Sequence, residues 1–231
     1  MMKFIKQLIG YTIKASDGDI GAVEEFYFDE DAWRVAYALV NLSDISERRH
    51  VLISLDTFME PDWKRKRFLI NATRELVRQS PDADRGLLSA IGIASDVTSY
   101  YDWPVYWNPA GAITPSMIAG KQQRAAVIEE SVAVQQLRGV KALIGFKVTG
   151  DDGTIGRLDD FVVDDVMWDI RSLAILFDRA GEEGMIQVSP DMVSHIYEAR
   201  GELSITLRKE LVRKNTSYNV LYEKIPEQVQ K

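Results

Sequence analysis

The side chains whose types and spacing could do chemistry are carboxylates gathered in short stretches. They are Glu24-Glu25, Asp29-Glu30-Asp31, Asp159-Asp160 and Asp164-Asp165. Carboxylates brought together from such stretches could bind a divalent cation, because hard cations prefer oxygen ligands. The spacing is not that of a helix–loop–helix calcium loop, and we expect neighbouring carboxylates on a strand to face solvent on opposite sides of the sheet. We therefore expect no metal site, and keep a small-ligand or divalent-metal module at these acidic turns as the alternative.

Two stretches place an Asp-Gly pair between apolar runs. They are Ser16-Asp17-Gly18 and the glycine-bearing loop Gly150–Gly156. The second superficially resembles a phosphate-binding loop, but no Lys-Ser/Thr pair follows it and no helical pattern begins after it. Asp-Gly between two apolar runs is typical of a tight β-hairpin. We interpret both stretches as hairpin turns and expect no cofactor.

The residues needed for nucleophilic catalysis are not assembled in this sequence. The chain has no cysteine, only two histidines, His50 and His195, and no Gly-x-Ser-x-Gly elbow. Two unrelated histidines do not supply the convergent partners of a catalytic triad or a histidine metal cluster. We expect both to be surface residues or hydrogen-bonded core residues. The sequence therefore predicts no catalytic residue and no enzymatic activity.

The distribution of charge does not favour a nucleic-acid partner. The formal net charge is −7, and the acidic excess is spread along the chain. Two basic stretches, Arg48-Arg49-His50 and Lys64-Arg65-Lys66-Arg67, carry no interleaved aromatic residues on which bases could stack. We interpret them as solvated surface, and keep an RNA- or ribosome-associated factor as a third hypothesis.

An internal repeat determines which elements position these residues. Leu8-Ile9-Gly10-Tyr11 recurs as Leu143-Ile144-Gly145-Phe146, and we call the shift from Leu8 to Leu143 the repeat offset. At this offset, ten of the 33 positions from Leu8 to Val40 are identical to their counterparts, where chance would give roughly two. Glu75–Arg78 also recurs at the repeat offset, as Glu210–Arg213. The chain therefore holds two copies of a unit of about 75 to 80 residues.

Each copy has the period-two pattern of short strands. Gly21 with Glu24-Glu25, and Gly156 with Asp159-Asp160, interrupt this alternation, which indicates β-bulges. Lys64, Lys66, Phe68 and Ile70 alternate as a fifth strand. Residues 73–78 and 208–213 look like a short closing helix. Five or six strands without crossover helices predict an antiparallel sheet, and closure into a small barrel would remove its exposed edges.

Between the copies lies a segment without strand periodicity. It contains five aromatic residues within eight positions: Tyr100, Tyr101, Trp103, Tyr106 and Trp107. So many large rings are too apolar for a freely solvated linker. They either pack as a buried clasp across both copies or remain exposed as anchors for a partner or for a second copy of this chain. We take these five residues as the candidate interaction surface.

The order of these motifs resembles the PRC-barrel family. The resemblance rests on Leu-Ile-Gly-aromatic, on the hairpin Asp-Gly followed by Ile-Gly, on the acidic pair before Phe, and on the Asp-containing turn before Trp. It covers about 75 residues in each copy. The family is named after the cytoplasmic domain of the photosynthetic reaction centre H subunit, and its fold is similar to the C-terminal domain of a ribosome maturation factor. The resemblance implies a small barrel that binds other proteins and helps to assemble complexes, and it implies no catalytic residues.

The sequence thus predicts a mostly β protein of two small antiparallel β-barrels in tandem, joined by a partly helical or irregular aromatic segment. The expected boundaries are 1–84, 85–137, 138–220 and a tail at 221–231. The sequence has no apolar run long enough to cross a membrane and no signal-like N-terminus, so we expect no membrane span and a cytoplasmic location. The function that we expect is protein–protein interaction or complex assembly with an unidentified protein, and a homodimer is also compatible with the sequence.

Overall fold

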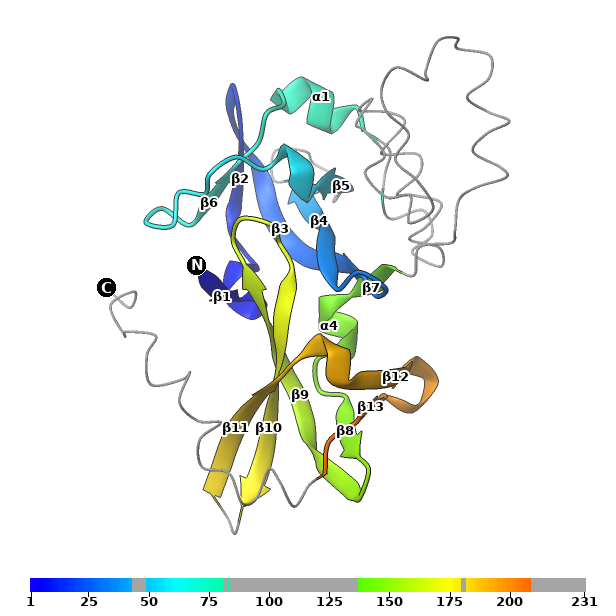
Figure 1. Cartoon of the computed structure of the whole chain (residues 1–231). Helices are drawn as coiled ribbons and strands as arrows, with labels where there is room; N and C mark the ends of the chain where they lie inside the picture. The colour runs from blue at the N-terminus through cyan, green and yellow to red at the C-terminus, as the bar shows by residue number, and fades with distance from the viewer. Residues whose placement is uncertain (43–48, 81–82, 84–136, 180–181, 209–231) are drawn as a thin grey trace, which may run out of the picture.

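The described part of the chain folds mainly as β-strands. The structure is a computed structural model that describes residues 1–42, 49–80, 83, 137–179 and 182–208 (Figure 1). These residues form two sheets with few helices, as the sequence pattern predicts. Among them, no helix is both long and apolar enough to cross a membrane.

The first copy supplies most of a six-stranded sheet. Its strand order is β5-β4-β3-β2-β6, and β7 adds to the free side of β3. The predicted hairpin turn at Asp17 joins β2 to β3. The elements of this half are β1 (Met2–Phe4), η1 (Ile5–Leu8), β2 (Thr12–Ala15), β3 (Gly18–Asp29), β4 (Arg34–Leu42), β5 (His50–Ser54), η2 (Leu55–Thr57), β6 (Arg67–Leu69) and α1 (Arg74–Arg78).

The second copy repeats this order in a seven-stranded sheet. The order is β11-β10-β9-β8-β13-β12, with β1 added to β9. The registers correspond at the repeat offset: Ala38 pairs with Ile53, and Leu173 pairs with Val188. The elements are β7 (Leu137–Gly139), α4 (Val140–Leu143), β8 (Lys147–Gly150), β9 (Gly153–Asp164), β10 (Ile170–Arg179), β11 (Glu182–Val188), η5 (Pro190–Met192), β12 (Val193–Tyr197), η6 (Glu198–Arg200) and β13 (Glu202–Ile205).

Both sheets are mixed, so the prediction of purely antiparallel sheets is wrong. β6 pairs with β2 in parallel, and β13 pairs with β8 in parallel. After β5 and after β11 the chain crosses to the other edge of its sheet. There β6 runs in the same direction as β2, and β13 runs in the same direction as β8. Residue patterns indicate the buried face of a strand but not its pairing direction. The predicted closure into barrels is not shown, because among the described residues no pairing joins β5 to β6 or β11 to β12.

The predicted bulges are present, and each lies close to a glycine that the packing of the strands requires. The register between β3 and β4 shifts between Val23 and Glu25, and the register between β9 and β10 shifts at the corresponding place. On the same strands, a Cβ atom at Gly21 would overlap the carbonyl oxygen of Asn41, and a Cβ atom at Gly156 would overlap that of Leu176. Glycine is required at these two positions because the neighbouring backbone approaches too closely for any side chain.

The fifth strand of the first copy is shorter than predicted. β6 begins only at Arg67, because Lys66 adopts a left-handed conformation with φ of 53° and the chain turns there. The predicted closing helix of the first copy is confirmed as α1, and the side chain of Thr73 accepts a hydrogen bond from the Leu76 N–H to cap it. Its predicted counterpart at 208–213 lies outside the described residues, apart from Arg208.

The two copies exchange their leading strands. Met2, Lys3 and Phe4 of β1 pair with Asp164, Val163 and Val162 of β9. Leu137, Arg138 and Gly139 of β7 pair with Asp29, Phe28 and Tyr27 of β3. These two pairings are equivalent at the repeat offset. Figure 1 shows β1 beside the upper end of β9 and β7 beside the lower end of β3. Each sheet is therefore completed by the other copy.

The junction between the copies is reciprocal at the level of single hydrogen bonds. The Val35 N–H donates to the Trp168 carbonyl at 2.9 Å, and the Ile170 N–H donates to the Trp33 carbonyl at 2.7 Å. Arg34 and Asp169, which are counterparts of one another, form a bridge between the copies. Such mutual contacts are those that an approximate two-fold axis through this bridge produces.

One hydrophobic core runs through both copies. Buried residues of η1 and α4 belong to it, together with the inner faces of both sheets. The ring of Phe26 stacks on that of Trp168 with centroids 6.3 Å apart, and the ring of Phe28 packs on that of Phe161 with centroids 5.5 Å apart. Because these contacts join the two copies, we expect the copies to unfold together. The predicted boundaries stay predictions, since residues 84–136 and 209–231 lie outside the described residues.

Candidate interaction site

The carboxylates of Asp29 and Asp164 shape turns. The Asp29 carboxylate accepts the N–H groups of Asp31 and Ala32 at 2.9 and 3.0 Å, and that of Asp164 accepts the corresponding N–H groups of Val166 and Met167 at 3.2 and 2.6 Å. Burial acts to raise the pKa of Asp164. The Met167 and Val166 N–H donors and the Arg171 guanidinium outweigh burial and hold this pKa below its usual value. Both residues form Asx turns that end the central hairpin of their copy.

The second carboxylate of each acidic pair holds the opposite copy. Glu25 accepts the Phe26 N–H at 2.9 Å and the Lys141 N–H at 3.1 Å. Asp160 accepts the Phe161 N–H at 2.8 Å and the Lys6 N–H at 3.1 Å. Lys6 and Lys141 lie in the first turns of η1 and α4, whose own preceding residues provide no side-chain cap. The carboxylates therefore cap the short helix that the other copy contributes.

Burial dominates the protonation of these two carboxyl groups. It raises the pKa of Asp160 to about 6 and raises that of Glu25, although the backbone donors act in the opposite direction. The sequence-based expectation that neighbouring carboxylates face solvent is wrong for Asp160, which is 3% exposed. The bulge leaves Asp159 unpaired in the ladder with β10, and the side chain of the next residue, Asp160, is buried.

The acidic turns do not assemble a cation site in the part of the chain that the structure describes. Their buried carboxylates face backbone donors, and no group of three or more histidine, aspartate or glutamate side chains is arranged to hold a metal ion there. The two histidines belong to different sheets. His50 Nε2 lies 2.8 Å from a carboxylate oxygen of Glu24, and the ring of His195 stacks on that of Tyr197.

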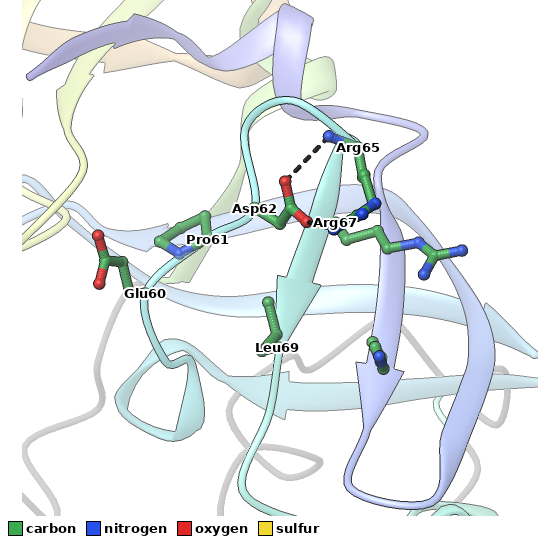
Figure 2. A pocket seen from close by; sticks show the side chains of 7 residues that line it. Glu60, Pro61, Asp62, Arg65, Arg67 and Leu69 are labelled. Atoms are coloured by element: carbon green, nitrogen blue, oxygen red, sulfur yellow. Dashed lines mark hydrogen bonds and ion pairs between the residues drawn. The ribbon is translucent and has the colours of Figure 1, made fainter.

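The basic stretch 64–67 borders an open hollow of about 630 Å³ (Figure 2). The residues that line it include both basic and acidic side chains. They are Lys14, Glu60, Pro61, Asp62, Arg65, Arg67 and Leu69. The Arg65 backbone N–H donates to Asp62 at 3.1 Å and the Arg65 guanidinium donates to it at 3.0 Å, and both hold the pKa of Asp62 below its usual value. Arg67 donates to Asp19 at 3.1 Å. The two arginines of the hollow are thus partly neutralised, which does not favour a phosphate-binding surface.

The other basic stretch serves the fold. The Arg49 guanidinium donates to the backbone carbonyls of Arg78 and Ser80, which fixes the segment after α1 against β5. Arg48 lies outside the described residues.

The five aromatic residues of the predicted interaction surface, Tyr100, Tyr101, Trp103, Tyr106 and Trp107, lie outside the described residues. The choice between a buried clasp and an exposed anchor stays open.

The structure reveals an exposed apolar surface that the sequence analysis missed. Val166 and Met167, in the turn between β9 and β10, are 75% and 49% exposed, and Met1 and Met2 are 78% and 50% exposed. These four residues, which we call the apolar turn patch, are neighbours: Met2 pairs with Asp164, and the Asp165 N–H donates to the Met1 carbonyl at 3.2 Å. The signal in the sequence is the difference between the copies, since Asp31 and Ala32 stand at the positions of Val166 and Met167.

Comparison with protein-family models finds a match, and it lies in the first copy. No curated protein matches the chain. The family model of the PRC-barrel domain matches residues 1–77, which include β1 to β6 and most of α1. The first copy is therefore similar to the PRC-barrel domain.

Proposed function

We propose that this chain is a non-enzymatic interaction protein that binds another protein through the apolar turn patch. The observation that carries the proposal is the exposure of Val166, Met167, Met1 and Met2 at one place on the surface. Contiguous apolar surface on a folded protein marks an interaction site. Fully burying a valine or methionine side chain contributes about 1.5–3 kcal/mol, so a partner that covers these residues gains several kcal/mol.

The apolar turn between β9 and β10 is particular to the second copy and is not a general property of the fold. In the first copy the corresponding turn is acidic, and Glu30 of this turn pairs with Arg138 at 2.5 Å. Both turns are shaped by the same aspartate contacts. The apolar side chains are therefore not needed to form the turn, which supports a role in binding. Methionine suits such a surface because its flexible thioether adapts to the shape of a partner.

The proposal treats both copies as PRC-barrel-type units. The similarity of residues 1–77 to that domain, together with the equal strand order and register of the second copy, supports this. The resemblance implies a module that helps to assemble complexes. We propose that the aromatic segment, with Trp103 and Trp107, contributes further anchors to the same interaction.

The experiment exchanges the turn of the second copy for that of the first. The double variant Val166→Asp/Met167→Ala places the residues of the first copy on an equivalent turn and should fold normally. Proteins captured by the wild-type chain from its native cells should be lost with this variant and kept with the control Asp191→Asn. Affinities for a recovered partner would then be measured with purified proteins. A partner that binds both variants equally well overturns the proposal.

The same variants distinguish a second copy of this chain from another protein. Sedimentation of the purified wild-type chain reports its association, and a dimer that Val166→Asp/Met167→Ala dissociates makes the partner a second copy. Replacement of Trp103, Tyr106 and Trp107 by alanine tests the aromatic segment separately. If only the aromatic variant loses a partner, the apolar turn patch is not the binding surface.

A further inference from the structure

One edge of the second sheet is formed by β12, beyond which no strand lies among the described residues. Figure 1 shows the hairpin of β12 and β13 at the margin of the second copy. The side chains of Ser194, His195 and Tyr197 are exposed on this hairpin. Within the described part of the chain, residues 194–197 make no backbone hydrogen bond other than those to β13. Alternate residues of an edge strand turn their N–H and C=O groups outward, so β12 offers unpaired backbone groups to another strand.

The first copy protects the equivalent edge, whereas the second copy does not. At the repeat offset, β12 corresponds to residues 58–62, which make only isolated bridges with residues 67 and 70 in the described structure. Pro61 lacks an N–H group, and Glu60 and Asp62 carry charges. Proline and charged side chains are devices by which proteins keep edge strands from pairing. The sequence of β12, Val-Ser-His-Ile-Tyr, contains no proline, acidic residue, lysine or arginine, so its backbone groups are accessible to a further strand.

The regular part of β12 is complementary to itself. Its register with β13 shifts between Val193 and His195, so residues 195–197 form the regular edge. An antiparallel pair of two such edges, centred on Ile196, places His195 of each chain opposite Tyr197 of the other. Both rings lie on one face of β12, where they stack with centroids 5.6 Å apart, so the four rings of the pair contact one another. Ile196 packs against the hydrophobic core and is only partly buried, so in this pair the two Ile196 side chains shield one another from water.

The charges at the two ends of β12 favour a second copy as the occupant. Asp191 precedes the strand and Arg200 follows it, and both side chains are exposed. Neither forms an ion pair with a described residue, and the guanidinium of Arg200 lies 5.3 Å from the centroid of the Tyr197 ring. The neighbouring Glu198 is paired with Arg138. Because antiparallel pairing sets the start of one strand beside the end of the other, it brings Asp191 of each chain toward Arg200 of the other.

We propose that β12 pairs with β12 of a second copy of this chain, antiparallel and across a two-fold axis at Ile196. The second sheets of the two chains then form one continuous sheet. The pairing is isologous, so it closes after two chains and does not extend into a fibre. The first copies stay outside it, because Pro61 and its acidic neighbours protect their edges. This interface consists of other residues than the apolar turn patch, and is therefore independent of the proposed binding of another protein.

Sedimentation of the chain over a range of concentrations tests this interface. We expect a monomer–dimer equilibrium in the wild type. Arg200→Asp and Asp191→Arg each set like charges against one another at both ends of the pair, and each should raise the dissociation constant of the dimer about tenfold. The double variant Asp191→Arg/Arg200→Asp should restore the dimer. Arg65→Asp, at the equivalent position of the first copy, is the matched control and should leave the dissociation constant unchanged.

A single cysteine tests the position of the two-fold axis. The chain has no cysteine, so Ile196→Cys places its two sulfur atoms opposite one another across the axis, within reach of a disulfide. Ser194→Cys is the control, because pairing centred on Ile196 keeps its two sulfur atoms apart. We expect a disulfide-linked dimer with Ile196→Cys and none with Ser194→Cys.

A chain that is monomeric at every concentration overturns the proposal. So does a dimer that Arg200→Asp leaves intact, and so does equal cross-linking of the two cysteine variants. A dimer that Val166→Asp/Met167→Ala dissociates lies on the apolar turn patch and likewise contradicts the β12 interface. If the amides of residues 195–197 are protected from hydrogen exchange only when another protein is bound, that protein is the occupant and a second copy is not.

Discussion

The backbone N–H of Lys6 donates a hydrogen bond to the buried carboxylate of Asp160, 154 positions away in the chain. The reciprocal bond runs from the Lys141 N–H to the carboxylate of Glu25. Each bond attaches the leading segment of one copy to the central strand of the other. The two acidic pairs that suggest a cation site in the sequence thus hold the exchanged segments in place.

Removal of the Asp160 carboxylate should destabilise the protein. Asp160→Ala leaves the Lys6 and Phe161 N–H groups without their acceptor, and we expect the free energy of unfolding to fall by about 1–3 kcal/mol. Asp160→Asn keeps an acceptor oxygen and should cost less than Asp160→Ala. Asp159→Ala removes only a partly exposed ion pair with Lys6 and should cost less than about 1 kcal/mol. Urea denaturation measures all three. A cost for Asp160→Ala no larger than that for Asp159→Ala contradicts the capping role.

Asp160 should also make stability depend on pH. Burial raises its pKa to about 6 in the folded chain, from the 3.8 that is ordinary for an aspartate. The folded state therefore holds this proton more tightly, so its contribution to stability is complete below about pH 4 and is lost as pH rises to about 6. A shift of this size corresponds to at most about 3 kcal/mol.

The difference between the wild type and Asp160→Asn isolates this effect, because other carboxyl groups titrate in both proteins. We expect the free energy of unfolding of the wild type, relative to that of Asp160→Asn, to decrease from pH 4 to pH 6 and to be constant above pH 7. A difference that is constant from pH 4 to pH 8 would show that Asp160 has an ordinary pKa.

Gly156 should not tolerate a side chain. The Cβ atom of Gly156→Ala would overlap the Leu176 carbonyl oxygen, and separating the strands should cost about 3 kcal/mol. Gly139→Ala is the control, because its Cβ atom would meet the Tyr27 ring no closer than 3.5 Å and its backbone is not left-handed. It should cost less than about 1 kcal/mol. Thermal unfolding of both variants gives the comparison, and a Gly156→Ala variant as stable as Gly139→Ala contradicts the described strand approach.

The turns and bulges of this fold could be predicted from the sequence because they depend on local chemistry. Asp17-Gly18 specifies a hairpin, and Gly21 followed by Glu24-Glu25 specifies a bulge wherever the strand is placed. Thr73 marks the start of α1 for the same reason, since its hydroxyl caps the helix.

The strand exchange could not be predicted, because it depends on contacts between distant segments. Met2–Phe4 and Leu137–Gly139 are too short to show a pattern, and nothing in their residues says which sheet edge they join. The burial of Asp160 follows from that exchange, since the N–H group of Lys6 that it accepts arrives from the other copy. The parallel pairing of β6 was missed because the face of a strand, and not its direction, is encoded in its alternation.

The reciprocal exchange of leading strands is the central claim, and a pair of engineered disulfides tests it most directly. Phe4 of β1 pairs with Val162 of β9, which belongs to the other copy. The residue of the first copy that corresponds to Val162 at the repeat offset is Tyr27, and Phe4 would lie opposite Tyr27 if the leading strands were not exchanged. In this cysteine-free chain, opposite residues of an antiparallel pair are close enough for a disulfide. We predict that Phe4→Cys/Val162→Cys forms an intramolecular disulfide in dilute solution and that Phe4→Cys/Tyr27→Cys does not. A disulfide in the second variant but not in the first would contradict the exchange.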